Sequence, residues 1–206
     1  MYISPRKKTP MNPQLNRNTF LVKEHVGMFK ASNSYDIYDP ANGTVIMNCR
    51  EEGLSVLTKI FRFTGYKTLT PFNVVIKTTE GQKVLAVKRG INLFLSKVEV
   101  RDENDKVIGI FKQKLFTIGG KFDVLDANGT YLCSLKGKWT GWDFKFVKDN
   151  LEFAHVTKKW AGMSKEFFTT ADNYILNINE NVPQNSPLRQ LIMAAVMCID
   201  MVLKEK

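Results

Sequence analysis

The residue types that most often carry catalysis are sparse in this 206-residue chain and do not stand in catalytic spacings. The two histidines, His25 and His155, lie far apart in the sequence, and we expect them to be ordinary strand or loop residues. No nucleophile-elbow, zinc-protease, dinucleotide-binding or P-loop motif occurs. The paired carboxylates Glu51-Glu52 and Asp102-Glu103 stand beside predicted turns, where solvated acids are common. The chain is therefore predicted not to be an enzyme.

Lysines that alternate with apolar residues offer a different chemistry, which is contact with an anion. Lys112 and Lys114 form one such pair and Lys136 and Lys138 form another, with Lys121 between them in the sequence. Alternate residues of a strand point to the same face, so each pair would lie on one outward face. We predict a lipid-binding surface made of Lys112, Lys114, Lys136 and Lys138. The sequence leaves open the alternative of a solvated exterior whose lysines guard against edge-to-edge association.

The overall charge favours the same kind of partner. With 30 Lys and Arg against 20 Asp and Glu, the chain carries +10, which favours binding to polyanions. Trp139 and Trp142 flank the second lysine pair, and aromatic rings beside lysines suit a membrane interface or a stacking surface for nucleic acid. They suit packing within a barrel equally well. An anionic phospholipid surface is the predicted partner, and nucleic acid is the alternative.

Residues 1–18 are predicted to form a flexible basic arm ahead of a single domain over residues 19–206. The arm, "MYISPRKKTPMNPQLNRN", holds basic residues and prolines but no acid, and it has no apolar run of signal-peptide length. The cysteines Cys49, Cys133 and Cys198 have neither disulfide-framework nor zinc spacing. We therefore expect a monomeric cytoplasmic protein with reduced thiols, and peripheral contact with a membrane is left open.

The elements that must position these residues are β-hairpins. Long stretches alternate polar and apolar residues on a period of two and are rich in Val, Ile, Phe and Tyr, which is typical of strands. Turn pairs that accept positive φ, as two-residue hairpin turns require, interrupt the alternation. They stand at Asn42-Gly43, Glu80-Gly81, Asn104-Asp105, Asn128-Gly129 and Asp149-Asn150. The last four hairpins recur about every 24 residues, one hairpin per unit.

The fold class predicted from this pattern is all-β with one central helix. About twelve mostly antiparallel strands would close into a barrel, which leaves no exposed edge. The C-terminal run "LIMAAVMCIDMVL", residues 191–203, is apolar on nearly every side as a helix, and Ser186-Pro187 supply a helix start. At about 20 Å it is shorter than a hydrocarbon core of about 30 Å. We therefore predict a buried helix over 188–203, inside a barrel too wide for its own side chains to fill.

The segment "AHVTKKWAGMSKEFFTTADNYILNI", residues 154–178, resembles the most characteristic stretch of the phospholipid scramblase family. In that family a Trp-x-Gly is followed by Glu, Phe-Thr, Ala-Asp-Asn and an aromatic residue. The matching residues here are Trp160, Gly162, Glu166, Phe168, Thr169, Ala171, Asp172, Asn173 and Tyr174. The hairpin that ends at Arg89, the first hairpin followed by Glu51-Glu52, and the closing helix with Ile199-Asp200 are also similar. The resemblance covers about residues 19–204.

The resemblance implies a Tubby-C-terminal-like fold, which LURP-one-related proteins share: a closed barrel of about twelve strands around a central hydrophobic helix. It also implies a non-enzymatic binding or scaffold role with weak contact to anionic phospholipid membranes. The alternatives are lipid translocation across a membrane and a nucleic-acid-binding or transcription-associated role. The stretch "INLFLSKVEV" departs from membrane-anchored relatives because it lacks their cysteines, so no acyl anchor is expected there.

The calcium loop proposed for the family corresponds to Thr170–Asn181 in this sequence. An EF-hand-type loop needs an acidic first ligand, a glycine at position six and an acid at position twelve. Those places hold Thr170, Ile175 and Asn181, and only Asp172 is a suitable ligand. We therefore predict no cofactor and no metal site, with Asp172 as a weak calcium candidate. Asp200 is either a solvent-facing acid at the barrel mouth or a buried functional carboxylate.

Calorimetric titration of the purified protein with calcium tests the prediction about this loop. We expect no binding in the micromolar range, because Thr170, Ile175 and Asn181 supply no carboxylate at the places where the loop needs one. Asp172→Ala is the matched variant. Micromolar affinity that this substitution abolishes would contradict the prediction.

Overall fold

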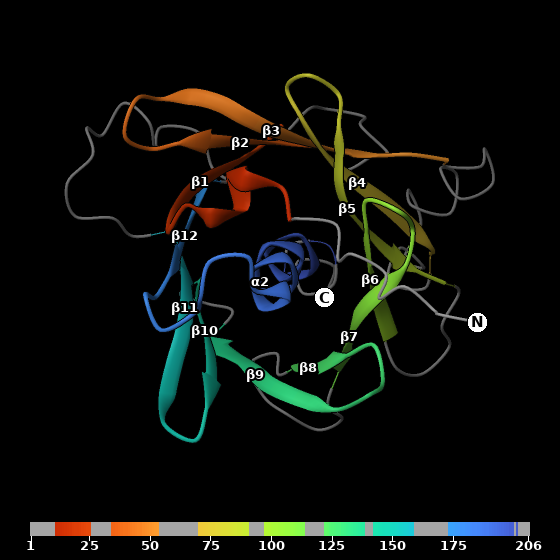
Figure 1. Cartoon of the computed structure of the whole chain (residues 1–206), viewed down its shortest axis with the longest axis vertical. Helices are drawn as coiled ribbons and strands as arrows, with labels where there is room; N and C mark the ends of the chain where they lie inside the picture. The colour runs from red at the N-terminus through yellow and green to blue at the C-terminus, as the bar shows by residue number, and fades with distance from the viewer. Residues whose placement is uncertain are drawn as a thin grey trace, which may run out of the picture.

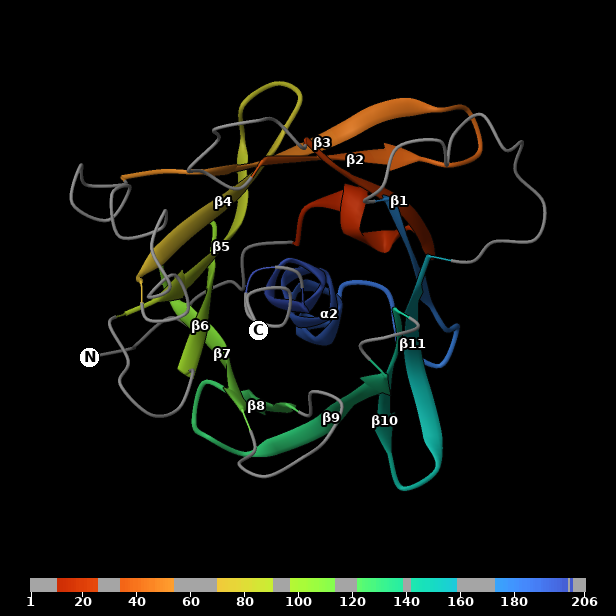
Figure 2. The ribbon, with the colours of Figure 1, turned by 180° about the vertical axis from the view of Figure 1, so that it is seen from behind.

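The computed structural model is a closed barrel of twelve antiparallel strands with one α-helix along its centre (Figures 1 and 2). It describes residues 11–25, 34–53, 70–90, 97–113, 122–138, 142–158, 173–199 and 201. The fold class predicted from the sequence is confirmed, including the number of strands and the central helix.

The strands follow one another around the barrel in chain order, and β1 pairs with β12 to close it. They are β1 (Thr19–Glu24), β2 (Ser34–Asp39), β3 (Thr44–Glu51), β4 (Phe72–Thr78), β5 (Lys83–Arg89), β6 (Lys97–Asp102), β7 (Val107–Gln113), β8 (Phe122–Asp126), β9 (Tyr131–Lys138), β10 (Asp143–Lys148), β11 (Leu151–Thr157) and β12 (Asn173–Ile178). A short 3-10 helix, η1 (Pro13–Asn16), precedes them, and the helix α2 (Pro187–Cys198) follows.

The two ends of the barrel differ in how the strands are connected. At one end, the hairpin end, tight turns over residues 40–43, 79–82, 103–106, 127–130 and 149–150 join successive strands. The odd-numbered strands run from this end toward the opposite one, which we call the loop end. The segments between the described ranges, such as 54–69 and 114–121, therefore connect strand ends at the loop end. α2 starts at the hairpin end, next to η1, and runs toward the loop end.

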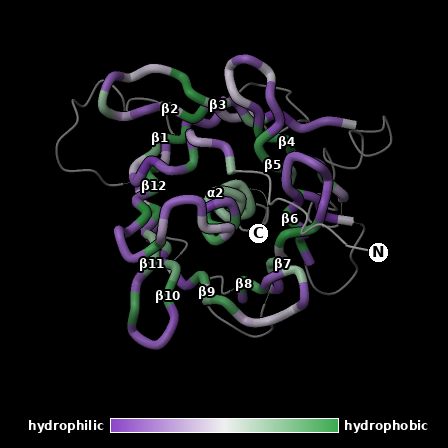
Figure 3. The backbone as a smooth tube through the Cα atoms, in the orientation of Figure 1, coloured by the Kyte–Doolittle hydropathy of each residue, from purple (hydrophilic) through white to green (hydrophobic). Residues whose placement is uncertain are grey.

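Aspartates hold the hairpin turns through hydrogen bonds to the backbone. Asp102 Oδ1 accepts from the N–H groups of Asn104 and Lys106, at 3.0 and 2.9 Å. Asp126 Oδ1 accepts in the same way from Asn128 and Thr130, both at 2.8 Å. Short polar side chains that bond to the chain two residues on are what such turns use. Figure 3 shows the resulting concentration of hydrophilic residues in the turns.

The predicted turn positions are confirmed, but most of the turns are of another type. A two-residue turn of the predicted kind needs positive φ at both central residues, and Asp149 and Asn150 meet this with φ of 47° and 67°. In the other hairpins only one residue has positive φ, namely Gly43, Gly81, Asp105 and Gly129. Register shifts beside all five turns mark bulges.

α2 fills the barrel interior. Ser186 caps it as predicted, because its side chain accepts a hydrogen bond from Leu188 N at 3.3 Å, and Pro187 stands in the first turn. Every residue from Arg189 to Ile199 is buried. The predicted enclosure of this helix is therefore confirmed over residues 189–199, and residues 202–203 of the predicted helix lie outside the described residues. Asp200 lies outside the described residues.

A buried arginine fastens the start of α2 to the mouth of the barrel. Arg189 is only 2% exposed, and burial lowers the pKa of its guanidinium. The guanidinium donates hydrogen bonds of 2.8–3.3 Å to the carbonyl oxygens of Leu15, Arg17, Val182 and Pro183 and to Asn18 Oδ1. None of these acceptors is a carboxylate, so oriented dipoles stabilise the charge.

Part of the predicted arm packs at this mouth of the barrel. Met11 and Leu15 are buried in the core, and residues 13–16 form η1. The structure thus places residues 11–18 against the start of α2, whereas the sequence assigns them to the flexible arm. Residues 1–10 lie outside the described residues.

Gly109 on β7 marks a place where α2 leaves no room for a side chain. A Cβ there would lie 2.5 Å from Leu191 Cδ2 and 2.7 Å from the carbonyl oxygen of Leu125. Gly109→Ala should lower the free energy of unfolding by about 1–3 kcal/mol, as overpacking a core does. Urea denaturation followed by circular dichroism measures this change.

Gly90→Ala is the matched control, because a Cβ at Gly90 meets nothing within 4 Å. We expect it to change the free energy of unfolding by less than about 1 kcal/mol. Equal losses in the two variants would contradict the close packing of α2 on β7.

Candidate functional site

The structure places the predicted lysine surface in part. Lys112, near the end of β7, and Lys136, near the end of β9, are both exposed, and each follows a buried residue on its strand. The predicted alternation therefore holds at these two positions, and β8 separates them. Lys114 lies outside the described residues, and Lys138 ends β9 but its side chain is not described.

Two further lysines extend this surface across the neighbouring strands. Lys97 on β6 is paired in register with Lys112, and Lys145 on β10 is paired with Lys136. Their side chains are 57% and 49% exposed, and Lys97 Nζ lies 3.8 Å from Glu99 Oε1. We call Lys97, Lys112, Lys136 and Lys145 the lysine band. The sequence did not predict that Lys97 and Lys145 belong to this band, because the register between neighbouring strands decides which residues lie beside Lys112 and Lys136.

Carboxylates lie among the lysines of this band. Asp123 on β8 is paired in register with Lys112, and its Oδ1 accepts a hydrogen bond from Ser134 Oγ at 3.0 Å. Glu152 accepts from Lys145 Nζ at 2.9 Å, and this bond together with the carboxylate charge raises the pKa of Lys145. The band therefore offers exposed lysines on a surface of mixed charge, which suits many weak contacts with an anionic plane better than one tight anion site.

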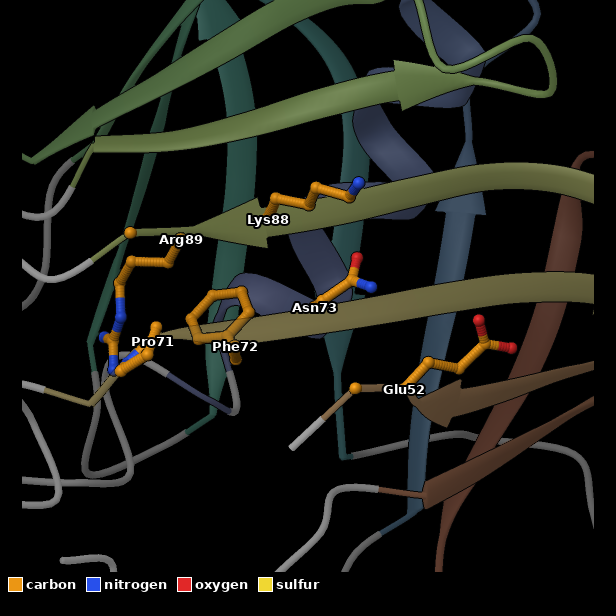
Figure 4. A pocket seen from close by; sticks show the side chains of 8 residues that line it. Glu52, Pro71, Phe72, Asn73, Lys88 and Arg89 are labelled. Atoms are coloured by element: carbon orange, nitrogen blue, oxygen red, sulfur yellow. The ribbon is translucent and has the colours of Figure 1, made fainter. Parts of the chain in front are cut away.

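A hollow of about 350 Å³ opens at the loop end between β3, β4 and β5 (Figure 4). Arg89, which the sequence had singled out, lies there with 3% exposure and donates to the carbonyl oxygen of Thr70 at 2.8 Å. Its guanidinium stands 4.7 Å from the centre of the Phe72 ring. In Figure 4 the side chain of Lys88 extends along β5, and that of Glu52 lies on the opposite, β3 side. The lining is thus of mixed charge, and the guanidinium of its arginine is bound to the Thr70 carbonyl and packed against Phe72.

Trp142 packs against the barrel at the same end. It stacks on the buried Tyr174 with ring centres 4.6 Å apart, and the Lys158 ammonium lies 4.5 Å from its ring centre. Its φ of 46° is unusual for a bulky residue. These contacts favour the packing role that the sequence left open for Trp142. Trp139 lies outside the described residues.

Each histidine pairs with an aspartate of a neighbouring strand. His25 Nε2 lies 2.7 Å from Asp36 Oδ2, and Arg50 Nη2 lies 2.6 Å from Asp36 Oδ1. Burial alone would raise the pKa of Asp36, but the hydrogen bonds and charges of Arg50 and His25 outweigh it and hold that pKa below its usual value. His155 Nε2 lies 2.7 Å from Asp143 Oδ1 in the same way, on a more exposed part of the surface.

The three cysteines are free and buried. Burial raises the pKa of Cys133 to about 12 and that of Cys49 and Cys198 well above the usual thiol value. A thiol in that state is a poor nucleophile and a poor metal ligand. Within the described ranges, no group of three or more His, Cys, Asp or Glu is arranged to hold a metal ion. Asp172, the weak calcium candidate, lies outside them, so the expected absence of a calcium site stays a prediction.

Among the residues that the structure describes, no helix combines the length and the apolarity that crossing a bilayer requires.

Comparison with known proteins identifies relatives of this chain. The family model described as "Scramblase" matches residues 16–206. A human protein, phospholipid scramblase family member 5, is 23% identical over 164 residues, which cover 72% of this chain and 58% of that protein. A phospholipid scramblase family protein of Schizosaccharomyces pombe is 22% identical over 223 residues, covering 96% of this chain and 58% of that protein. This chain thus spans little more than half the length of these relatives. No solved structure matched it.

The Asp36 cluster predicts a pH dependence of stability. A carboxyl group whose pKa is lowered in the fold stabilises the fold above its unfolded pKa of about 3.9, and loses this contribution as the pH falls through the folded pKa. Asp36→Asn should therefore lower the free energy of unfolding near neutral pH, and the deficit should shrink below about pH 4. Urea denaturation of parent and variant from about pH 7 to pH 3 measures it.

Asp143→Asn serves as the matched control, since Asp143 also pairs with a histidine but its side chain is 56% exposed, against 15% for Asp36. Exposed pairs contribute less than about 1 kcal/mol, so this variant should stay close to the parent at neutral pH. A deficit in Asp36→Asn that stays constant down to about pH 3 would rule out the proposed linkage.

Proposed function

The chain belongs to the scramblase family, and on that premise we propose that it is a non-enzymatic binding or scaffold protein that makes weak contact with anionic phospholipid membranes. The observation that carries the proposal is the lysine band on the outer face of β6 to β10. Each cation near such a membrane contributes about 1 kcal/mol. Four of them support reversible binding, and salt weakens it because exposed charges are screened over about 8 Å at physiological ionic strength.

The non-enzymatic part of the proposal rests on the chemistry of the candidate groups. The thiols are buried and protonated, as the raised pKa values of Cys49, Cys133 and Cys198 indicate. Hydrogen bonds of the described residues join neither histidine ring to a hydroxyl or a thiol, which a nucleophile–base pair needs. Both rings instead face carboxylates on the outer surface, an arrangement that stabilises strand pairing.

Lipid translocation is the second candidate, which the names of the curated relatives suggest. α2 is the most apolar element of the chain, and the barrel wall covers it from Arg189 to Ile199. For α2 to meet lipid, strands would have to separate and Arg189 would have to leave its five acceptors. Membrane contact through the lysine band requires neither change, and we therefore place it first.

Vesicle co-sedimentation tests the proposal. We expect the parent protein to bind vesicles that contain phosphatidylserine, to bind neutral phosphatidylcholine vesicles weakly, and to lose binding as salt is raised. Replacing Lys112, Lys114, Lys136 and Lys138 with Ser should remove most of this binding. Lys112 and Lys136 are exposed, and the other two are predicted to be. Exposed positions change stability by within about 0.5 kcal/mol, so the thermal unfolding midpoint should stay nearly unchanged.

Two companion assays separate the alternatives. A DNA shift assay at matched salt identifies nucleic acid as the preferred partner if DNA binds more tightly than the anionic vesicles. Loss of labelled lipid asymmetry in reconstituted vesicles would support translocation. Should the quadruple variant bind anionic vesicles as well as the parent does, these lysines form only a solvated exterior.

A further inference from the structure

The charges of the described residues are divided between the two halves of the barrel. When each strand is cut at its middle, the half that contains the hairpin turns holds seven Lys and Arg, including the buried Arg189, and nine Asp and Glu. The acids are Asp39, Glu80, Asp102, Glu103, Asp105, Asp126, Asp149, Glu152 and Glu180. The net charge of the hairpin half is therefore −2.

The half toward the loop end has the opposite sign. It holds ten Lys and Arg and seven Asp and Glu, for a net charge of +3. The cations are Lys23, Arg50, Lys88, Arg89, Lys97, Lys112, Lys136, Lys138, Lys145 and Lys158. All four members of the lysine band belong to this half.

The two ends of the barrel are far enough apart to interact separately with a charged surface. A strand of seven residues is about 23 Å long, whereas screening reduces the field of an exposed charge over about 8 Å at physiological ionic strength. When one end touches an anionic plane, the interaction of that plane with the charges at the other end is therefore almost fully screened. Attraction then depends on which end is presented, more than on the total charge.

We propose that the protein meets an anionic phospholipid surface with the lysine band and the loop half of the barrel wall, and that the acidic hairpin turns face away from the membrane. This orientation rests on the proposed membrane contact and adds a direction to it. The described lysines of the loop half supply the attraction, and the turn carboxylates oppose the reverse orientation. The hydrogen bonds that hold Asp102 and Asp126 fix these charges in place.

Two charge-reversal pairs with the same total charge test the orientation. The first is Lys112→Glu with Lys136→Glu in the loop half, and the second is Lys106→Glu with Lys148→Glu in the hairpin half. Each pair lowers the net charge by four, from +10 to +6. Attraction by net charge alone predicts the same loss of binding for both, whereas the proposed orientation predicts very different losses.

We expect the loop-half pair to weaken binding to phosphatidylserine vesicles at least about tenfold, since about 1 kcal/mol per cation is lost and repulsion is added. The hairpin-half pair should weaken it less than about twofold, because those positions are screened from the membrane. Thermal unfolding of both variants verifies that the barrel is intact.

The outcomes distinguish this inference from the function on which it rests. If the parent does not bind anionic vesicles, the membrane contact itself fails. If the parent binds and the two pairs weaken binding equally, membrane contact stands and the orientation is overturned. A larger loss in the hairpin-half pair would reverse the orientation.

Discussion

The central constraint on this protein is the width of its barrel. About eight strands already enclose a space that their own side chains fill, and this barrel has twelve. Its interior must therefore be occupied by another element that is apolar on every side, and α2 is that element. Because wall and helix meet without spare volume, β7 has a glycine where Leu191 lies against it. Neither the strands nor α2 could bury their apolar residues without the other.

Placing a helix inside the barrel creates a problem at its first turn, where the chain must enter. Arg189 lies at this entrance and joins three segments through its acceptors: η1, the two residues before β1, and the connection from β12. Burying a cation costs several kcal/mol, and the five hydrogen bonds offset that cost. The net gain in stability is thus modest. What Arg189 mainly provides is a defined entrance, which also explains why Leu15 is held in the core although its sequence reads as part of a basic arm.

The sequence predicts those features that depend on local period and composition. Strand alternation, turn positions and the apolarity of residues 191–199 were sufficient for a closed barrel with a central helix. The turn types were not predictable, because bulges arise from strand twist and register. Within the site, alternation predicted outward positions for Lys112 and Lys136. It could not show that Asp123 pairs with Lys112 or that Lys145 adjoins Lys136, since cross-strand partners lie nine or more residues apart.

The turn aspartates have two effects, since they hold the hairpin turns by hydrogen bonds and also place negative charge at one end of the barrel. A turn of this kind needs a short side chain that accepts a hydrogen bond from the following backbone, and an amide serves as well as a carboxylate. Asn42 shows this, because its Oδ1 accepts from Thr44 N at 3.0 Å. The hydrogen bonds within the turns therefore explain the presence of Asp102 and Asp126 but not their charge. The charge adds a repulsion from an anionic surface that an amide would lack, and it does so at the end of the barrel opposite to the lysine band. The same turns that join successive strands thus make the two ends of the barrel electrostatically different.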